Sequence, residues 1–595
     1  MERRAYDGAH VIPGRSTLAG PEAPATPRSV PAVPQQAQSL TLSSGAVFGA
    51  ALLIQLLGMV GTIFLYKQIG INGEGRLLIG TAQLFLLIAS SINGVGDLRL
   101  GTAYTFFLAR GQPPAQSTTT YLAVRTVLVA AAGVILFGIA PLSIGGHQVA
   151  SGTQQIESIG VFLTLPILWS FSTVYNQMYI GLGNSLKAQY PGLVEAIARL
   201  PALVYVAYDM KSLQGITYAY ALGAAVSAAY SFPAIYPRLK AFHRLEAVRL
   251  FRFAWPLMAS LMLNYLVTNM VPLILAAGLG AAQLTVFLAA NGWRILVLSL
   301  PAAVTTPLFP YLAGLHRQER YETLRRSTWQ ALRYSAMLLV PGVVALVTYR
   351  FTFLNVFANH TYAVPGATPL AILVASALPL ALSQIMQSSI NAIGRQRLEL
   401  YITSTQVSVL IVGVVVMMPP WGILPANLGI VAGALAVLFS SVAALLLNTI
   451  FMERLIRVHI DPWSIARITV SAAGSFAALS ELNRTHLFPV HSWIELLAAV
   501  VLGFLAYFLI LAGVGELTAA DVRQIVSQLS LPPALGEWLG RLCWRKSLPD
   551  LPTIDLRTAV GFRSTELPET FSGTTELPSL EPMSTSDDES GRPLP

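Results

Sequence analysis

Residues Trp255–Leu312 read WPLMASLMLNYLVTNMVPLILAAGLGAAQLTVFLAANGWRILVLSLPAAVTTPLFPYL, and this stretch decides the fold of the chain. It contains two long apolar runs joined by a short Gly/Ala turn, and each run is long enough to cross a bilayer as a helix of about 20 residues. One arginine, Arg294, lies deep inside the second run. A charged side chain at that depth is costly unless it faces protein or water, so Arg294 is a candidate functional residue.

The whole chain, like this stretch, is rich in hydrophobic residues and poor in charged ones. Of its 595 residues, 54% are hydrophobic and 11% are charged, whereas soluble domains carry about a quarter charged residues. The chain is therefore predicted to be an all-α polytopic membrane protein. The net charge of +9 is explained by membrane topology rather than by a nucleic-acid partner, because the basic residues sit in short loops between apolar runs. The single cysteine, Cys543, excludes an intrachain disulfide and a cysteine-based metal site.

Windows of about 20 predominantly apolar residues predict about fourteen transmembrane helices. Their approximate ranges are 45–66, 77–96, 119–142, 159–182, 190–208, 214–236, 253–277, 283–310, 334–357, 367–393, 399–418, 425–451, 464–480 and 491–513. Residues 1–44, which are rich in Pro, Ala, Ser and Gln, are predicted to form a disordered tail.

The distribution of basic residues predicts the orientation of the chain. Most Lys and Arg residues fall in loops on the amino-terminal side, whereas the opposite loops hold only Lys67, Arg76, Lys211 and Arg484. Because cytoplasmic loops carry the excess of basic residues, both termini are predicted to lie in the cytoplasm. We expect a multi-pass protein of the cytoplasmic (inner) membrane, in contact with membrane lipids.

An internal repeat relates the two halves of the chain. An offset of about 210 residues pairs Gly70 with Gly280 and residues 179–183 with residues 390–394. Since each half holds six predicted helices, the two halves enter the membrane in the same orientation, and the substrate path of such repeats lies near their interface. The predicted divisions are an N-lobe at 45–236, a basic cytoplasmic loop at 237–252, a C-lobe at 253–451 and two further helices within 452–514.

The carboxyl-terminal part of the chain has a different pattern. Within residues 515–546, apolar Leu535, Trp538 and Leu539 recur at helical spacing beside Arg541. This pattern predicts amphipathic cytoplasmic helices that lie either on the anionic inner leaflet or against the ends of the helix bundle. Residues 547–595, with repeated Glu-Leu-Pro and Ser/Thr/Asp clusters, are predicted to be a disordered cytoplasmic tail.

Several of these residues resemble the polysaccharide flippases. The matching features are Phe253-Ala-Trp-Pro256, the Gly-Leu-Gly turn at 278–280, Ala290 four residues before Arg294, Pro307-Leu-Phe-Pro310, Ile390-Asn-Ala-Ile-Gly-Arg395 and Gly429-Ile-Val-Ala-Gly433. These flippases are membrane carriers of undecaprenyl-linked oligosaccharides. They belong to the multidrug/oligosaccharidyl-lipid/polysaccharide exporter (MOP) superfamily, with the lipid II flippase and the multidrug and toxin extrusion antiporters. One departure is that this chain has Thr268-Asn-Met-Val-Pro272 where many relatives carry an Asp.

The resemblance implies a flippase that moves polyprenyl-pyrophosphate-linked oligosaccharide by alternating access for polysaccharide biosynthesis and export. Glycosyltransferase or polymerase components of a polysaccharide system are the partners it implies. The pyrophosphate would need a cation inside the protein, and a guanidinium donates two parallel hydrogen bonds to phosphate oxygens. Arg294 in the eighth predicted helix and Arg199 in the fifth are the candidates, and Arg294 occupies the position of an arginine in the central cavity of the lipid II flippase.

For each arginine a structural alternative stays open. Arg294 could instead make hydrogen bonds between helices. Arg199 follows Glu195 by four residues, which is the favoured order for a helical ion pair, so the two side chains could neutralise each other. Arg125, about two turns from the cytoplasmic end of the third predicted helix, is expected to extend its side chain to the membrane surface.

Uncharged polar side chains are the candidates for binding sugar. The candidates on the tenth predicted helix recur at i, i+3, i+4 and i+7 and therefore share one face; they are Gln384, Gln387, Ser388 and Asn391. The repeat-equivalent positions on the fourth predicted helix are Thr173, Asn176 and Gln177. Further candidates are Asn264 on the seventh predicted helix and Asn291 on the eighth. Hydrogen bonding between helices is the alternative role for all of them.

Enzyme signatures are not found in the sequence. No pair of histidines has the spacing of metal ligands on a helix, and no Gly-rich phosphate loop precedes Lys-Ser or Lys-Thr. We therefore expect a protein that is not an enzyme and that needs neither cofactor nor metal. Two other functions stay open: a multidrug antiporter of the same fold, for which Glu195 would be the coupling carboxylate, and a non-transporting scaffold of a polysaccharide assembly system.

Overall fold

The computed structural model describes residues 36–109, 114–139, 143–144, 147–148, 153–418, 428–458, 461–485 and 492–517. The predictions for residues 1–35, and those for the amphipathic helices and tail beyond residue 517, lie outside this part of the chain.

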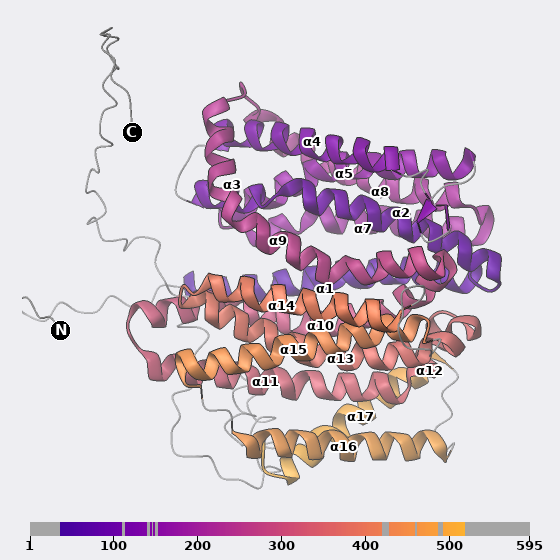
Figure 1. Cartoon of the computed structure of the whole chain (residues 1–595), viewed down its shortest axis with the longest axis vertical. Coiled ribbons are helices and arrows are strands. Elements are labelled where there is room, and N and C mark those ends of the chain that lie inside the picture. The colour runs from indigo at the N-terminus through magenta and orange to yellow at the C-terminus, as the bar shows by residue number, and fades with distance from the viewer. Residues whose placement is uncertain are drawn as a thin grey trace, which may run out of the picture.

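The described residues are almost entirely α-helical, as predicted (Figure 1). The first half, which we call the N-lobe, contains α1 (Gln36–Gln68), α2 (Gly73–Asp97), α3 (Leu100–Ala109), α4 (Pro114–Ile139), α5 (Thr153–Gly181), α6 (Ser185–Ala188), α7 (Tyr190–Tyr205) with its π-helical continuation Val206–Met210, and α8 (Leu213–Ile235) with a 3₁₀ turn at Tyr236–Arg238. Between α4 and α5, two-residue strands β1 (Ser143–Ile144) and β2 (His147–Gln148) pair antiparallel.

The second half begins with the long helix α9 (Arg244–Leu279). With α9, the C-lobe contains α10 (Ala281–Arg317), α11 (Tyr321–Thr348), α12 (Arg350–Phe357), α13 (His360–Ala392), α14 (Gln396–Met417) and α15 (Ile430–Ile456). Two further helices are α16 (Pro462–Arg484) and α17 (Trp493–Gly513). In Figure 1 the N-lobe helices lie at the top, the C-lobe helices below them, and α16 and α17 at the bottom, beside α11.

A helix lies at each of the fourteen predicted positions. Among the described residues, eleven helices are long and apolar enough to cross a membrane by length and composition. The three predicted spans outside this set correspond to the 16-residue α7 and to α8 and α16, which are rich in Ala and Ser. The predicted number of fourteen crossings therefore remains a prediction.

Three helices begin nine or more residues before the apolar windows predicted. Helix α1 begins at Gln36 rather than 45, α11 at Tyr321 rather than 334, and α9 at Arg244 rather than 253. Residues 36–44 of the predicted disordered tail are therefore helical, and the predicted basic loop is helical from Arg244 onward. In α9 the physical reason is packing, because Leu250 and Ala254 are buried in an apolar cluster with α3, α4 and α5.

The internal repeat is visible in the backbone at the ends of α5 and α13. Gly183 and Gly394, which the repeat pairs, have φ of +77° and +78°, a conformation that favours glycine. The N–H of Gly183 donates to the carbonyl of Ile180 at 3.0 Å, and that of Gly394 donates to the carbonyl of Asn391 at 3.0 Å. The two helices therefore end in the same way, 211 residues apart.

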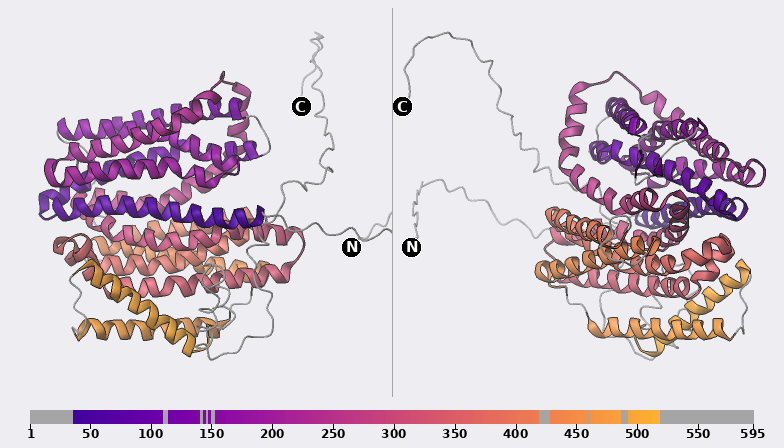
Figure 2. Two further views of the ribbon diagram at one scale, coloured as in Figure 1. Left: turned by 180° about the vertical axis from the view of Figure 1, so that it is seen from behind. Right: turned by 45° about the vertical axis from the view of Figure 1, so that its right-hand side comes forward.

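Helix α9 connects the two lobes along its length. It contacts α2, α3 and α4 of the N-lobe and α10, α14 and α15 of the C-lobe. The view from behind in Figure 2 shows α1 along the boundary between the lobes, where α1 contacts α10 and α12. The largest cluster of buried apolar side chains includes Phe85 and Phe162 of the N-lobe and Phe287 and Leu370 of the C-lobe.

Direct polar contacts join the lobes at the end of the bundle where α1 passes into α2. Asn359 caps α13, since its Oδ1 accepts from the N–H of Thr361 at 3.0 Å, and its Nδ2 donates to the carbonyl of Tyr66 at 2.8 Å. The Thr361 hydroxyl donates to the carbonyl of Gly70 at 3.1 Å. The rings of Tyr66 and Tyr362 lie 4.9 Å apart.

Helices α2 and α10 meet beside these contacts. The hydroxyl of Thr285 donates to the carbonyl of Arg76 at 3.2 Å, and Arg76 Nη1 donates to the carbonyl of Thr361 at 3.4 Å. Gly80 lies so close to α10 that a Cβ atom there would be 1.9 Å from the carbonyl oxygen of Ala281. We call the contacts of Tyr66, Gly70, Arg76 and Gly80 with Ala281, Thr285, Asn359, Thr361 and Tyr362 the inter-lobe latch.

Replacing Gly80 by Ala should separate the lobes at the latch, because the added methyl group would occupy the position of the Ala281 carbonyl. Spin labels at Ile71→Cys and Val364→Cys, in a Cys543→Ser background, would report the separation as a longer distance by pulsed electron paramagnetic resonance. Gly73→Ala is the matched control, since no atom lies within 4 Å of a Cβ there. Equal distances in the two variants would contradict the role of Gly80.

Candidate functional site

A cavity of about 520 Å³ lies between the lobes, adjacent to the latch. Its walls come from α1, α2, α5, α7 and α8 of the N-lobe and from α10 and α12 of the C-lobe. This volume is within the range of about 300–1,000 Å³ typical of small-molecule sites. The polar side chains that line it are Gln55, Thr62, Tyr66, Gln83, Ser90 and Arg199, and the aromatic ones also include Trp169, Tyr220, Trp293 and Phe357.

The helical repeat of α1 produces the longest wall. Gln55, Met59, Thr62 and Tyr66 are four, three and four residues apart, which places them on one face of the helix. The Thr62 hydroxyl donates to the carbonyl of Gly58 at 3.0 Å. A polar face therefore runs along α1 through the cavity to the latch.

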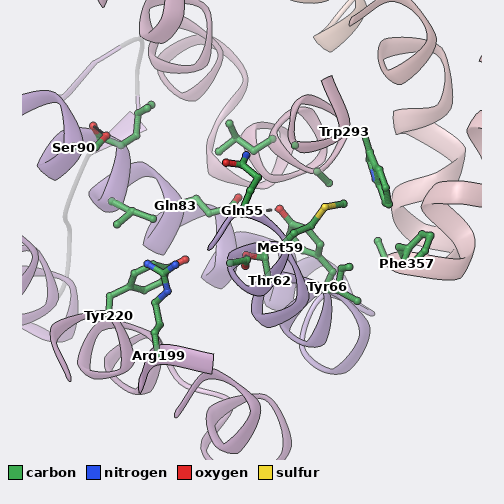
Figure 3. Close-up of a pocket in the computed structure, with 18 of the residues that line it drawn as sticks. Gln55, Met59, Thr62, Tyr66, Gln83, Ser90, Arg199, Tyr220, Trp293 and Phe357 are labelled. Carbon is green, nitrogen blue, oxygen red and sulfur yellow. Dashed lines mark hydrogen bonds between the residues drawn. The ribbon is translucent and has the colours of Figure 1, made fainter. Parts of the chain in front are cut away.

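Helix α2 supplies the neighbouring wall. The amide Nε2 of Gln83 donates to the hydroxyl of Tyr66 at 2.7 Å, so this bond joins α2 to α1 at the cavity (Figure 3). Gln83 Oε1 is buried and has no hydrogen-bond partner among the residues that the structure describes. The hydroxyl of Ser90, two turns further along α2, donates to the carbonyl of Leu87 at 2.9 Å.

Arg199 lies at the N-lobe side of the cavity, with its guanidinium against the ring of Tyr220 (Figure 3). The guanidinium carbon is 5.0 Å from the ring centroid, which is within the range of a cation–π contact. Arg199 Nη1 donates to Glu195 Oε1 at 3.1 Å. Both alternatives for Arg199 are therefore seen, since it lines the cavity and also pairs with Glu195.

This pairing leaves Arg199 with hydrogen-bonding capacity. A guanidinium has five N–H donors, and the carboxylate of Glu195 accepts one bond from it. Because the two side chains are only 17% and 15% exposed, the pair avoids an uncompensated charge inside the protein. Arg199 can therefore offer donors to an anionic ligand while Glu195 balances its charge.

Arg294 lies next to the cavity but not among the residues that line it. The preceding residues on α10, Gly292 and Trp293, line the cavity. Arg294 Nη1 donates to Asn291 Oδ1 on the same helix at 3.3 Å, and its Nε is buried without a partner in the described part of the chain. No carboxylate among the described residues lies within ion-pair distance of this guanidinium.

The polar stripes predicted on α13 and α5 do not meet at this cavity. None of Gln384, Gln387, Ser388, Asn391, Thr173, Asn176, Gln177 and Asn264 lines it. Asn391 Nδ2 instead donates to Glu399 Oε2 at 2.8 Å, and Gln177 Oε1 accepts from the hydroxyl of Thr105 at 2.7 Å. The structure thus uses these two members of the stripes in bonds within each lobe.

The cavity contains polar residues that the sequence analysis did not single out. The most prominent are Gln55, Thr62, Gln83 and Ser90. A signal was available in the sequence, since the first two lie seven residues apart on α1 and the last two lie seven apart on α2. Two consecutive helices thus carry polar residues at helical spacing, as expected for helices that share a polar cavity.

A second buried charge cluster lies within the N-lobe, centred on Arg125. Its side chain is 1% exposed and forms an ion pair with Asp97 at the end of α2. Arg125 Nη2 donates to Asn93 Oδ1 at 2.6 Å and to the hydroxyl of Thr173 at 3.3 Å, and the hydroxyl of Tyr121 donates to Asp97 at 2.6 Å. The expectation that Arg125 extends to the membrane surface is therefore wrong, because Asp97 supplies a counter-ion inside the lobe.

Three comparisons relate the chain to known proteins. Residues 184–365 match a family described as polysaccharide biosynthesis protein. No curated protein matches the chain in sequence. Among solved structures, the lipid II flippase MurJ in an inward closed conformation is similar over 79% of this chain and 97% of that chain, with a TM-score of 0.64 and 12% identity.

Other membrane transporters are also similar in structure. An inward-facing multidrug resistance MATE family transporter is similar over 68% of this chain and 94% of the transporter's own chain, with a TM-score of 0.56 and 15% identity. A MOP superfamily transporter from Pyrococcus furiosus covers 71% and 96%, with a TM-score of 0.52 and 13% identity. The fold of this chain is therefore similar to that of these solved transport proteins. The match at residues 184–365 is to a family of polysaccharide biosynthesis proteins, which is the process that the resemblance implies for this chain.

Replacing Arg125 by Met would leave the carboxylate of Asp97 without its buried counter-ion, so we expect a loss of stability of about 3 kcal/mol. The apparent melting temperature of the purified protein in detergent would measure this loss. The double variant Arg125→Met/Asp97→Asn removes both charges and should recover most of it. The control Arg350→Met removes an exposed arginine and should change little. A double variant no more stable than Arg125→Met would contradict the ion pair's role.

Proposed function

We propose that this protein moves a polyprenyl-pyrophosphate-linked oligosaccharide across the cytoplasmic membrane, by alternating access to the cavity between its lobes. The observation that carries the proposal is the cavity itself, which combines polar and aromatic walls and is next to the latch. A lipid-linked oligosaccharide presents a pyrophosphate and a polar glycan that need a path through protein. Its polyprenyl tail can remain in lipid.

The cavity residues suit the two polar parts of such a substrate. The guanidinium of Arg199 can donate parallel hydrogen bonds to phosphate oxygens. The amides of Gln55 and Gln83 and the hydroxyls of Tyr66 and Ser90 suit sugar hydroxyls, which donate and accept hydrogen bonds. Arg294, whose guanidinium has no counter-ion among the described residues, would bind the pyrophosphate at another stage of the cycle.

Buried carboxylates favour a flippase over a multidrug antiporter. An antiporter coupled to protons or sodium needs a carboxylate inside the membrane that can bind the ion. Glu195 pairs with Arg199, and Asp97 pairs with Arg125. Both carboxylates are therefore already neutralised by arginines. A scaffold that transports nothing would have no use for a polar cavity between the lobes.

The direction of transport follows from the predicted topology. With both termini in the cytoplasm, the loop between α1 and α2 lies outside, so the latch closes the outer end of the cavity. Glycosyltransferases on the inner side would supply the substrate, and polymerase components on the outer side would consume it. We propose that the structure represents the state in which the outer end is closed.

Loss of the protein should cause lipid-linked oligosaccharide to accumulate on the inner leaflet and should abolish the surface polymer. Leaflet-resolved measurement of lipid intermediates in a deletion strain tests this. An unchanged pool of intermediates would exclude the flippase function. Complementation with Arg199→Ala or Arg294→Ala, at normal membrane abundance, should reduce polymer about tenfold or more, because each loses a charged hydrogen-bond donor. The exposed Arg350→Ala is the matched control and should complement fully.

The topology makes a separate prediction that cysteine labelling can test. In a Cys543→Ser background, Ile71→Cys should react with a membrane-impermeant maleimide from the outside of intact cells. Leu245→Cys, at the start of α9, should react only after the membrane is permeabilised. Both side chains are well exposed, at 58% and 83%, so access depends on the side of the membrane. The reverse pattern would place the latch at the cytoplasmic end.

A further inference from the structure

Tyr66 belongs to both the cavity and the latch. Its hydroxyl accepts a hydrogen bond from Gln83 Nε2 at 2.7 Å inside the cavity, as the dashed line in Figure 3 marks. Its carbonyl accepts from Asn359 Nδ2 at 2.8 Å, and its ring lies 4.9 Å from that of Tyr362. One residue of the N-lobe therefore touches the ligand space and holds two contacts with the C-lobe.

The Gln83–Tyr66 pair has unused hydrogen-bonding groups. Gln83 Oε1 is a buried acceptor with no partner in the described part of the chain. The Tyr66 hydroxyl accepts from Gln83 and retains its own proton as a donor. The pair thus offers one acceptor and one donor side by side, in a cavity whose lining also includes Trp169 and Tyr220.

This combination discriminates between the two polar parts of a lipid-linked saccharide. Ionised phosphate oxygens only accept hydrogen bonds, so a pyrophosphate cannot satisfy Gln83 Oε1. A sugar hydroxyl both donates and accepts, and so does the amide of an N-acetylated sugar. The cation of Arg199, which lines the same cavity from α7, suits the phosphate instead.

We propose that Gln83 and Tyr66 form a sugar-reading subsite, whose occupation by a sugar hydroxyl or acetamido group loosens the latch through Tyr66. The inference rests on the proposed flippase function and deepens it. A sugar that donates to Gln83 Oε1 and accepts from the Tyr66 hydroxyl uses the two groups that the Gln83–Tyr66 bond leaves free, and it draws both side chains toward itself. Since Tyr66 also carries the contacts with Asn359 and Tyr362, any shift of its side chain acts directly on the latch. A carrier lipid without its sugar leaves the latch closed.

The test uses the full chain in lipid nanodiscs with two probes. The probes are undecaprenyl pyrophosphate carrying one N-acetylglucosamine and undecaprenyl pyrophosphate alone. Affinity is measured for both probes, and latch separation is measured with the spin labels at positions 71 and 364. We expect the wild type to bind the sugar-bearing probe more tightly and to show a longer latch distance with that probe only.

Two variants each remove one half of the subsite. Gln83→Leu removes the acceptor, and Tyr66→Phe removes the hydroxyl while it keeps the ring and the backbone carbonyl. Each should reduce the preference for the sugar-bearing probe roughly three- to tenfold, the effect of one neutral hydrogen bond, and leave binding of the bare lipid unchanged. Thr217→Val is the matched control, because it removes an α8 hydroxyl that does not line the cavity and is already bonded to the carbonyl of Leu213, and it should keep the preference.

The outcomes separate this inference from the proposed function. Equal binding of the two probes by the wild type would overturn the subsite and still support a lipid-pyrophosphate carrier. Binding of neither probe would overturn both. If Gln83→Leu and Tyr66→Phe kept the wild-type preference, the sugar would be read elsewhere. The two variants could lose the preference for the sugar-bearing probe while the wild type shows the same latch distance with both probes. That result would overturn the coupling through Tyr66.

Discussion

The close approach of Gly80 to the backbone of α10 sets how the two lobes meet. A glycine at this position lets the α2 backbone approach the carbonyl of Ala281 to a distance that no side chain allows. Around this point, hydrogen bonds from Thr285, Asn359 and Thr361 fix the ends of α1 and α2 against the C-lobe. The cavity depends on this arrangement, because α1, α2 and α10 supply most of its walls.

The second constraint on the structure is the cost of charge inside a membrane protein. The N-lobe reduces this cost with two ion pairs, Arg199 with Glu195 and Arg125 with Asp97. Pairing reduces the cost of burial but also removes the carboxylates from other uses. Arg294 in the C-lobe follows a different pattern, since only Asn291 of the described residues accepts a hydrogen bond from it. The two lobes therefore share a fold but not a distribution of charge.

Much of the fold could be predicted, because its causes are local in sequence. Apolar windows found a helix at each of fourteen positions, and the spacing of glycines found the repeat that Gly183 and Gly394 display in their backbones. Helix starts at Gln36, Arg244 and Tyr321 were missed, since an apolar window measures the membrane-length part of a helix and not its extension into water. Arg125 was misplaced because its distance from the helix end predicted exposure, whereas Asp97 lies 28 residues away in sequence.

The sequence by itself determined that the chain is helical, membrane-spanning and built from two similar lobes, because hydropathy and helical period depend only on near neighbours. It also identified Arg199 and Glu195 as a pair, since four residues bring two side chains together on one helix. Only the tertiary structure decided which polar faces share a cavity. Gln384 and Gln83 both lie on polar helix faces, yet only Gln83 lines the cavity, because the packing of α2 against α1 and α10 places it there.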